Sequence, residues 1–433
     1  MHNSTFRRRA SIYVMVLGTS LVVSVIGLSA LLAIRIKRRT VELTIDFAQA
    51  RLHAQSAIEL GFRRISSDPN WRTTYPNGVW EADRPIGTGT FTLEGTDPDG
   101  LPLSNDVMDD LVLTGIGVQG DSRYKLRVTL VAQPQPLTCL EASLHAGNDL
   151  SLFAPSTVYG NQVISANNKI AATGAPTVYP DMESVNGFSG TLSPGAQRLL
   201  DEPRTMPAPA TVFDYYKNNG TWINIANIPI ENGVRTIADT VIAPILNPYG
   251  AINALGIYVI DCQGEIIQIR DSRIIGTLVL LNTSSGSCVY NSINWEPAVA
   301  NYPALLVEGK LDLVYTNASL VEAIGVNLNP LGVPYLGEED TLLDDVYPSR
   351  IKGLIYLSGD SGTATDQIPG GYSQSIHVTI DGVMVVGDSY AQTINPSNLD
   401  LTYRQTLLDN PPPGFFDPPK MVISPGTWRQ VVD

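Results

Sequence analysis

Four oxygen-bearing side chains lie close together in one turn-rich stretch: Asp97, Asp99, Asn105 and Asp106, the first two within Asp-Pro-Asp-Gly. Such oxygens are the ligands that Ca²⁺ takes in proteins, but the closing glutamate of an EF-hand loop is missing here. An Asx-turn, in which an aspartate binds the backbone two residues on, explains the same residues. Asp97, Asp99 and Asp106 are therefore a calcium candidate with a structural alternative, and we expect no other metal or cofactor.

A second acidic stretch, Glu338-Glu339-Asp340 followed by Asp344-Asp345, offers several carboxylates in a short span. Carboxylates alone do not define a calcium loop, because spacing and backbone geometry select the ion. A solvated surface loop is the better explanation for these residues.

Carboxylates of the type that cleaves polysaccharides are present but scattered. Such a reaction needs a pair of carboxyl groups flanking the scissile bond, with one of them able to donate a proton. The candidates are Asp261, Asp271 with Arg273, Asp312, Asp360 and Asp381. No spacing places them on one face, and aspartates in solvated turns explain them. We expect no catalytic residue and no enzymatic activity; an enzyme or binder of surface polysaccharide is the alternative.

The cysteines and histidines give little support for a metal or redox site. The four histidines are scattered, and the three cysteines (Cys139, Cys262 and Cys288) form no Cys-x-x-Cys pair. Cys262 and Cys288 could lie on adjacent turns of a coiled β structure and form a disulfide. Buried unpaired thiols explain them equally well, so this pairing stays open.

The chain is acidic, with 42 Asp or Glu against 28 Lys or Arg in 433 residues. Residues 1–39 contain seven of the basic residues and no acidic one, so the acidity belongs to the remainder. Phosphates would repel such a region, and we expect no nucleic-acid partner. Charged residues are only 16% of the chain, while Gly (37) and Pro (30) are abundant, a composition that favours a turn-rich β protein.

Residues 10–34 form an uncharged, mostly apolar run. A helix needs about 20 residues to cross a hydrocarbon core of roughly 30 Å. A cleavable signal peptide has a shorter apolar region, of about 7–15 residues, with small residues at the cut site. Here the run ends instead in the basic cluster 35–39, so we predict a retained single-pass anchor with membrane lipid as its partner. The basic residues on its two sides nearly balance, so charge does not settle the orientation.

The helical pattern continues beyond the membrane run. Apolar residues recur at three- and four-residue steps from Val41 to Ile65, and this stretch contains no proline. We predict one helix over residues 10–66, ending before Pro69 because the residue before a proline avoids helical geometry. Two helices broken at residues 35–39 are the alternative. Small residues in the span (Gly18, Gly27, Ser29 and Ala30) would let other helices pack closely in lipid.

Everything after the helix has a β pattern. Residues 68–138 are predicted to form a small antiparallel domain, with a strand at 90–94 and a hairpin made by 111–118 and 124–131.

Residues 139–409 repeat an apolar residue, a spacer, a glycine and then a strand, around Gly276, Gly353, Gly382 and, more loosely, Gly160. A glycine at a corner between stacked strands predicts a right-handed parallel β-helix-like head, with a β-sandwich as the alternative. Residues 410–433 form a Pro-rich tail, expected to lie extended along the head and to end in an edge strand at 421–428.

The N-terminal segment combines a basic leader (1–9), a small-residue junction at Ala10-Ser11, the apolar span, and a helix containing Ala48-Gln49-Ala50-Arg51. In this combination it resembles minor pilins of the PilX type and, more loosely, the pseudopilin at the tip of type II secretion systems. The resemblance covers residues 1–66. It implies an envelope protein whose helix packs with other pilin-like subunits, and processing between Ala10 and Ser11.

Two positions depart from the pattern of this family. The residue before the junction is Ala10 where prepilins usually have glycine, and Met15 stands where most have a glutamate at the fifth mature position. Tip-type minor pilins can lack that glutamate, so the resemblance implies a capping or initiating subunit. Whether the leader is cleaved stays open.

We therefore expect a membrane-anchored, pilin-like structural or adhesive protein with its head outside the cytoplasm, in the periplasm or at the cell surface. It would be a minor subunit of a type IV pilus or a type II secretion-like filament. A helix that is bare and apolar along its outer half would favour assembly with other subunits. Three or more carboxylates converging in a groove of the head would favour the polysaccharide alternative.

Overall fold

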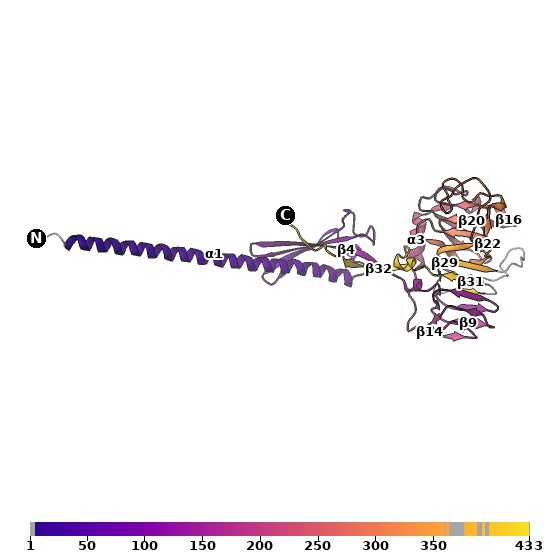
Figure 1. Ribbon diagram of the computed structural model, residues 1–433, viewed down its shortest axis with the longest axis horizontal. Helices are drawn as coiled ribbons and strands as arrows, with labels where there is room; N and C mark the ends of the chain where they lie inside the picture. The colour runs from indigo at the N-terminus through magenta and orange to yellow at the C-terminus, as the bar shows by residue number, and fades with distance from the viewer. Residues whose placement is uncertain (1–4, 360, 363–375, 388–391, 395–397, 433) are drawn as a thin grey trace. The chain divides into compact units, whose positions relative to one another are not determined.

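The protein is mainly β with one long N-terminal helix, as the sequence predicts (Figure 1). The computed structural model describes residues 5–359, 361–362, 376–387, 392–394 and 398–432. The chain forms two compact units, which are Met1–Gln133 with Pro418–Asp433, and Pro134–Asp417. Asp360, one of the scattered carboxylates, lies outside the described residues.

The N-terminal helix α1 (Thr5–Ser67) is continuous. It runs through the basic cluster 35–39, where Arg38 Nε donates to Glu42 at 2.9 Å, one turn later. The alternative of two helices is therefore wrong, because no residue in this stretch interrupts the helical hydrogen bonds and the charges can pair along the surface. The helix ends at Ser67, ahead of Pro69, as predicted.

The first unit places the second half of α1 on an antiparallel sheet with the strand order β1-β2-β3-β4-β32, and β33 also pairs with β4. The elements are α2 (Trp71–Thr74), β1 (Gly78–Ile86), β2 (Gly89–Thr96), β3 (Leu111–Gln119), β4 (Ser122–Pro136), β32 (Phe416–Ile423) and β33 (Arg429–Gln430). The predicted hairpin is confirmed: β3 and β4 pair from Leu111↔Leu130 to Gln119↔Ser122, around a two-residue turn.

Two glycines of β3 let the helix approach the sheet closely. A Cβ on Gly115 would lie 2.2 Å from the carbonyl oxygen of Ala54, and a Cβ on Gly117 would lie 2.0 Å from that of Ala50. The two alanines are fully buried at this contact. Small residues on both sides thus fix the helix on the sheet, and large apolar side chains surround the contact: Ile58, Trp71, Trp80, Phe91, Leu93, Leu113 and Val128.

The tail is divided between the two units. Phe415 is fully buried in an apolar cluster of the second unit, whereas Pro418–Asp433 belongs to the first unit. The edge strand expected at 421–428 is present in part, because β32 includes Met421 to Ile423 and pairs with β4.

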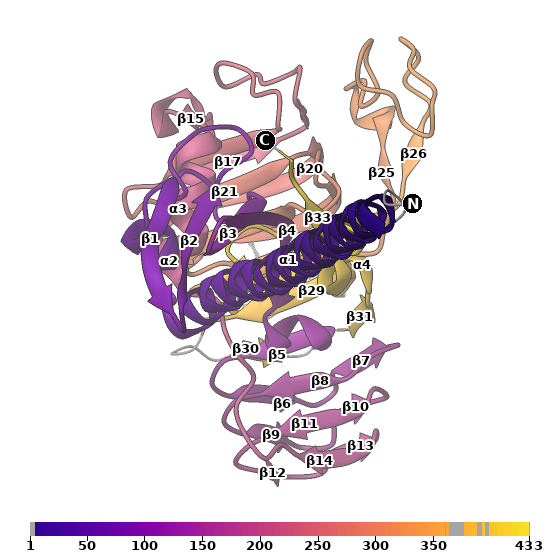
Figure 2. The ribbon, with the colours of Figure 1, turned by 90° about the vertical axis from the view of Figure 1, so that its left-hand side faces the viewer.

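Strands of the second unit, the head, pair mainly in parallel and stack one above another (Figure 2). Leu144, Ile164, Met182 and Gln197 are consecutive partners, so the chain returns to the same column after 20, 18 and 15 residues. The longest column consists of β14 (Gln197–Leu199), β11 (Met182–Ser184), β8 (Ile164–Ala166), β5 (Leu144–Ala146), β29 (His377–Val386), β27 (Arg350–Leu357), β23 (Pro303–Gly309), β21 (Thr277–Thr283), β19 (Ile257–Asp261) and β15 (Thr221–Ile223).

Other strands of each coil form neighbouring columns. One consists of β12 (Phe188–Ser189), β9 (Ile170–Thr173), β6 (Leu150–Phe153), β30 (Gln392–Ile394) and β28 (Ser361–Gly362). A second includes β13 (Ser193–Pro194), β10 (Thr177–Val178), β7 (Thr157–Gly160) and β31 (Asn398–Thr402). The larger coils add β16 (Ile230–Glu231), β17 (Val234–Ala238), β18 (Val241–Ile242), β20 (Ile267–Ile275), β22 (Cys288–Glu296) and β24 (Asp312–Tyr315). These pairings do not match the β-sandwich alternative, whose sheets are antiparallel.

The predicted glycine corners are part of this stacking. Gly353 and Gly382 are direct partners in β27 and β29, and a Cβ on Gly382 would lie 1.9 Å from the carbonyl oxygen of Gly353. Gly276 separates β20 from β21, and a Cβ there would lie 2.3 Å from the carbonyl oxygen of Gly256. Consecutive coils therefore approach too closely at these corners for any side chain.

The apolar core of the head lies inside the coils, and a second apolar cluster covers the outside of the longest column. The covering elements include α3 (Pro209–Asn219), α4 (Thr406–Asp409) and the 3₁₀ turn η1 (Thr138–Glu141). A loop arm carries β25 (Leu320–Val321), η3 (Glu322–Ile324) and β26 (Val346–Tyr347), and η2 (Ile225–Asn227) follows β15.

Candidate functional sites

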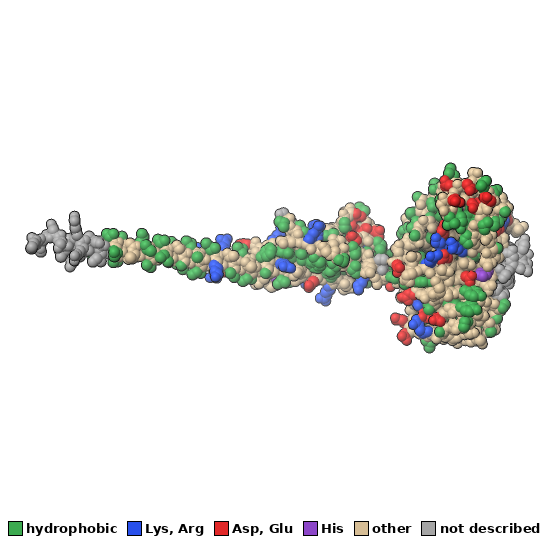
Figure 3. All heavy atoms as spheres, in the orientation of Figure 1, with side chains coloured by type: hydrophobic (Ala, Val, Ile, Leu, Met, Phe, Trp, Pro, Cys, Tyr) green, Lys and Arg blue, Asp and Glu red, His purple; other side chains and the backbone are tan. Residues whose placement is uncertain are grey.

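The outer half of α1 is exposed and apolar. Every side chain from Tyr13 to Ile45 is exposed, and fifteen large apolar side chains lie between Tyr13 and Ile36 (Figure 3). By length and composition this helix could cross a membrane. The predicted packing residues Gly18, Gly27, Ser29 and Ala30 all lie on this exposed stretch. A Cβ on Gly18 or Gly27 would meet nothing within 4 Å, so both glycines leave room for a neighbouring helix. The processing candidates Ala10 and Ser11 lie within the helical backbone of α1.

The loop between β2 and β3 brings together three carboxylates. The ligand oxygens of Asp97, Asp99 and Asp109 all lie within 4.8 Å of one another. All three aspartates singled out from the sequence form Asx-turn bonds: Asp97 accepts the Asp99 N–H at 3.1 Å, Asp99 the Leu101 N–H at 2.8 Å and Asp106 the Met108 N–H at 2.8 Å. The Asx-turn alternative is therefore confirmed, and Asp106 is not part of the three-carboxylate group. Burial raises the pKa of Asp97, and the Leu101 N–H lowers the pKa of Asp99 by donating to its carboxylate.

Asp109 was missed in the sequence because it lies ten residues beyond Asp99. No local sequence signal marks it, because it joins the group through strand register: Thr96 pairs with Val112, so residues just after β2 face residues just before β3. An antiparallel pair brings the two ends of its connecting loop together whatever the loop length.

A second acidic group, Glu322 with Asp344 and Asp345, lies in the loop arm of the head. The fully buried Glu322 carboxylate accepts the Leu328 N–H at 2.6 Å, the Tyr347 O–H at 2.8 Å and the Asp345 N–H at 3.2 Å. These donors satisfy both oxygens, so Glu322 ties the loop to β26. Two further acidic residues of the stretch bind the loop backbone in the same way: Glu339 accepts the Gly332 N–H and Asp340 the Leu342 N–H.

The scattered carboxylates have local partners. Asp261 accepts the Gln263 N–H and the Asn282 side chain, each at 2.9 Å. Asp271 binds Arg270 at 3.0 Å, while the Arg273 guanidinium donates to the carbonyls of Leu328, Val333 and Pro334. Asp271 and Arg273 therefore have different partners, Arg270 for the former and backbone carbonyls for the latter. Asp312 is the first residue of β24.

Asp381 lines a cavity of about 660 Å³ in the head. Its buried carboxylate is paired with Arg404, at 2.5 Å for one oxygen, and with Arg350 at 3.5 Å. Glu296 and Asp409 also line the cavity, and Glu296 is paired with Lys352 at 3.0 Å. Three carboxylates thus line one cavity. Arginine and lysine side chains offset the charge of two of them, Asp381 and Glu296.

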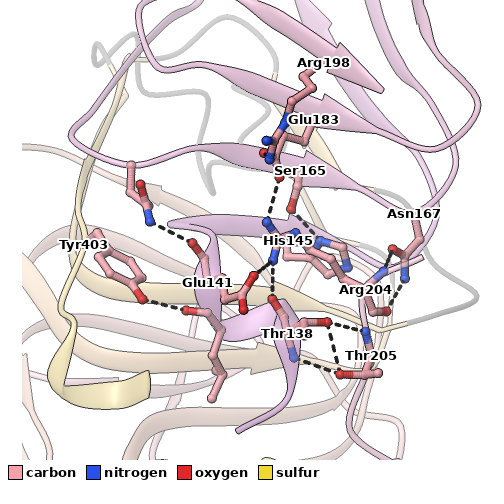
Figure 4. A network of polar contacts seen from close by, with 12 residues as sticks. Thr138, Glu141, His145, Ser165, Asn167, Glu183, Arg198, Arg204, Thr205 and Tyr403 are labelled. Atoms are coloured by element: carbon pink, nitrogen blue, oxygen red, sulfur yellow. Dashed lines mark hydrogen bonds and ion pairs between the residues drawn. The ribbon is translucent and has the colours of Figure 1, made fainter. Parts of the chain in front are cut away.

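A network of polar side chains crosses the outside of four stacked strands (Figure 4). His145, Ser165, Glu183 and Arg198 occupy one position in β5, β8, β11 and β14, respectively. His145 Nδ1 lies 2.7 Å from Ser165 Oγ, and Glu183 is paired with Arg198. Burial, with a smaller contribution from the Arg204 charge, lowers the pKa of His145 to about 3.

Arg204 and Thr205 bind the segment that contains them to these strands and to η1. Its guanidinium pairs with Glu183 at 2.7 Å and with Glu141 at 2.6 Å, and donates to the Thr138 carbonyl at 2.6 Å. Thr205 N–H donates to Thr138 Oγ1 at 2.7 Å, which extends the attachment. Every charge in this group has a partner within the protein, so the network holds the segment in place.

Cys262 and Cys288 are both buried and both free thiols. Burial raises the pKa of each thiol to about 12. The interpretation as core thiols is therefore the one that the structure supports, and the disulfide alternative is wrong.

No protein-family model matches the sequence, and no curated protein matches it either. Among solved structures, the chain is similar to the competence-associated pilin ComZ from Thermus thermophilus. The match has a TM-score of 0.32 at 8% sequence identity and covers 90% of this chain and 98% of that chain.

Proposed function

We propose that this protein is a membrane-anchored, pilin-like structural subunit. The apolar run of α1 that ends at Ile34 spans the membrane and packs against helices of other pilin-like subunits, and the acidic head lies outside the cytoplasm. The protein acts by assembly and adhesion rather than by catalysis. Within a filament of the type IV pilus or type II secretion kind, it is a minor subunit at the tip or at the start of assembly.

The observation that carries this proposal is the bare outer half of α1. Burying one Val, Leu or Ile side chain contributes about 1.5–3 kcal/mol. The fifteen exposed apolar side chains are therefore much more stable in an apolar environment than in water. Lipid supplies such an environment, but lipid does not explain why glycines stand at positions 18 and 27. Glycines in a membrane helix allow close approach of another helix, which favours a packed assembly.

The inner half of α1 supports the same proposal. Ala50, Ala54 and Ala57 are fully buried against the sheet, so the first unit holds the helix as a rigid rod. The second half of α1 is thus held by the first unit, whereas its outer half is exposed and available to pack with other helices.

The test uses the full-length protein in membranes of its native host. Gly27→Leu fills the open space beside the glycine, whereas Leu31→Ile keeps the volume of an exposed residue on the same span. We expect both variants to stay in the membrane and only Gly27→Leu to lose chemical cross-links to other subunits. Intact mass provides a second readout, because processing removes Met1–Ala10. A wild-type protein that is full-length and forms no cross-links would contradict the proposal.

A second candidate is a tethered binder of surface polysaccharide, favoured by the cavity that contains Glu296, Asp381 and Asp409. The carboxylates and the paired cations could bind sugar hydroxyl groups. The test is calorimetry of full-length protein in detergent with a panel of neutral and acidic polysaccharides. Binding that is lost in Lys352→Ala and kept in Lys420→Ala, which changes a lysine of the first unit, would support this candidate; no binding to any member of the panel would exclude it for that panel.

A further inference from the structure

The two ends of the β2–β3 loop meet at one point. Thr96 and Val112 are partners in the sheet, so Asp97 and Asp109 lie on facing sides of the loop, and Asp99 joins them from the first turn. Their ligand oxygens all lie within 4.8 Å of one another. Two oxygens that bind one Ca²⁺ at about 2.3–2.6 Å can be no more than about 4.6–5.2 Å apart. The three carboxylates therefore meet the spacing that a shared calcium ion requires.

Two of these carboxylates have buried oxygens without a partner. Asp97 is only 6% exposed, and its Oδ1 accepts the Asp99 N–H at 3.1 Å while its Oδ2 has no hydrogen-bond donor. The Oδ2 of Asp109 is likewise buried without a donor. A buried charged oxygen that lacks a donor is costly, and native proteins rarely leave one unsatisfied. A bound cation would satisfy both oxygens at once.

The Arg72 guanidinium lies beside this loop and its charge interacts with Asp97 and Asp109, but its described hydrogen bonds do not go to their carboxylates. The Arg72 guanidinium donates to two backbone carbonyls, those of Leu103 at 3.1 Å and of Asp109 at 2.5 Å. It also lies over the Trp71 ring, with its central carbon 4.6 Å from the ring centroid. Arg72 thus fixes the backbone of the loop. Asp99 accepts the Leu101 N–H at 2.8 Å and the Asn105 side-chain amide at 3.3 Å, so the buried oxygens without a donor are the Oδ2 atoms of Asp97 and Asp109.

The acidic group of the loop arm provides the contrast. Glu322 is as deeply buried as Asp97, but backbone N–H groups and the Tyr347 hydroxyl satisfy both of its oxygens. A group whose oxygens already have donors has no need of a metal. The two groups therefore differ in whether their buried carboxylate oxygens have hydrogen-bond donors, and not in the number of acidic residues.

We propose that Asp97, Asp99 and Asp109 bind a Ca²⁺ ion that holds the two ends of the β2–β3 loop together. The donor set consists of oxygen alone, which suits a hard cation and not Zn²⁺. Flexible loop carboxylates suit Ca²⁺ better than Mg²⁺, which requires near-ideal octahedral geometry at about 2.0–2.1 Å. Water completes the coordination shell on the exposed side, where Asp99 lies.

The test is calorimetric titration of CaCl₂ into full-length protein that has been stripped with a chelator and kept in detergent. We expect one ion per chain, with a Kd at or below about 1 mM. Asp97→Asn and Asp109→Asn should each weaken binding by about tenfold or more, because each removes a charged ligand. Asp106→Asn is the matched control, since it removes the same charge from the same loop but not from the three-carboxylate group. Its affinity should stay within about twofold of wild type.

Terbium luminescence gives an independent readout, because Tb³⁺ takes calcium sites and Trp71 and Trp80 lie in the same apolar cluster as this end of the sheet. If Asp97→Asn impairs folding, Asp99→Asn tests the same site through an exposed side chain. Absence of calorimetric heat and of calcium-displaceable Tb³⁺ luminescence would overturn the proposal. So would equal loss of affinity in Asp106→Asn, or Mg²⁺ binding as tight as Ca²⁺ binding.

Discussion

Replacing Gly117 by alanine should push α1 away from the sheet and weaken the contact between them. The new Cβ would lie 2.0 Å from the Ala50 carbonyl oxygen and 2.6 Å from the Ala54 nitrogen, whereas real Cβ atoms essentially never approach within 3.0 Å. Both obstacles are backbone atoms, so no side-chain rotation relieves the clash. The helix has to withdraw by about 1 Å, and a gap of that size forfeits roughly a quarter to a half of the dispersion attraction across it.

The expected loss of stability is about 3 kcal/mol, the upper part of the range for overpacked cores. Because the chain forms two compact units, one global free energy of unfolding is not defined, and a local measurement is needed. Hydrogen exchange of full-length protein in detergent, read by mass spectrometry on peptides of β3, supplies it. A loss of about 3 kcal/mol corresponds to roughly 100-fold faster exchange.

Gly61→Ala is the matched control in the same interface. Its Cβ would meet Leu113 Cδ1 at 2.9 Å, the far end of a flexible side chain, and alanine is favoured over glycine in a helix by about 1 kcal/mol. Exchange in β3 should therefore stay near the wild-type rate. Unchanged exchange in Gly117→Ala, or equal acceleration in both variants, would refute the view that backbone contact fixes the helix.

Three further predictions concern the head. The pKa of His145 is lowered to about 3 in the folded protein, whereas an unfolded histidine has a pKa of about 6.5. Between these two pH values, acid protonates this histidine in the unfolded chain but not in the folded one. The head should then lose about 1.4 kcal/mol per pH unit, and His145→Asn should abolish that slope in acid unfolding; an unchanged slope would assign it to other groups. Asp381→Asn breaks a pair with the half-exposed Arg404, so β29 amides should exchange about 10- to 30-fold faster, and unchanged rates would contradict a stabilising pair. Cys262 and Cys288 should resist N-ethylmaleimide in the native state and react in urea, and rapid native labelling would show that the core opens.

Patterns that are local in sequence predict their structures well here. The helix, the hairpin of β3 and β4, and the glycine corners each depend on residues within a few positions of one another. The causes of the helix and the hairpin are equally local, namely helical periodicity and a two-residue turn. The glycines are marked by a local motif, although the close approach that requires them joins separate coils, as between Gly353 and Gly382. The extension of α1 through the basic cluster follows from the same rule, since Arg38 finds Glu42 one turn away.

Features that depend on strand register were not accessible from the sequence. Asp109 joins Asp97 only because β2 and β3 pair as they do. Likewise, the column of His145, Ser165 and Glu183 exists only once the coils are stacked at separations of 20 and 18 residues, and Arg204 reaches it from another segment. No local motif marks such residues, because each is unremarkable among its own neighbours.

The order of the coils explains how the C-terminal strand reaches the first unit. Suppose that the ten strands of the longest column followed one another in chain order. The first and last strands of the head would then lie roughly 43 Å apart, at 4.8 Å per step. The chain instead starts in the middle, where β5 pairs with β29, and the segments before and after the head lie side by side. Leu137 N–H donates to the Phe415 carbonyl at 3.1 Å, directly before β32 begins.

This arrangement requires one junction between distant parts of the chain, formed by the pairings of β5 with β29, β6 with β30 and β7 with β31. His145 and Val385 are partners although they are 240 residues apart, whereas coils on either side of that junction join residues close in sequence. Distant pairings form slowly, because the chain loses entropy before the contact stabilises it. The two halves of the stack can each form from local coils, and their junction is expected to close late. That junction also brings Phe415 to Leu137, directly before β32, the strand that pairs with β4.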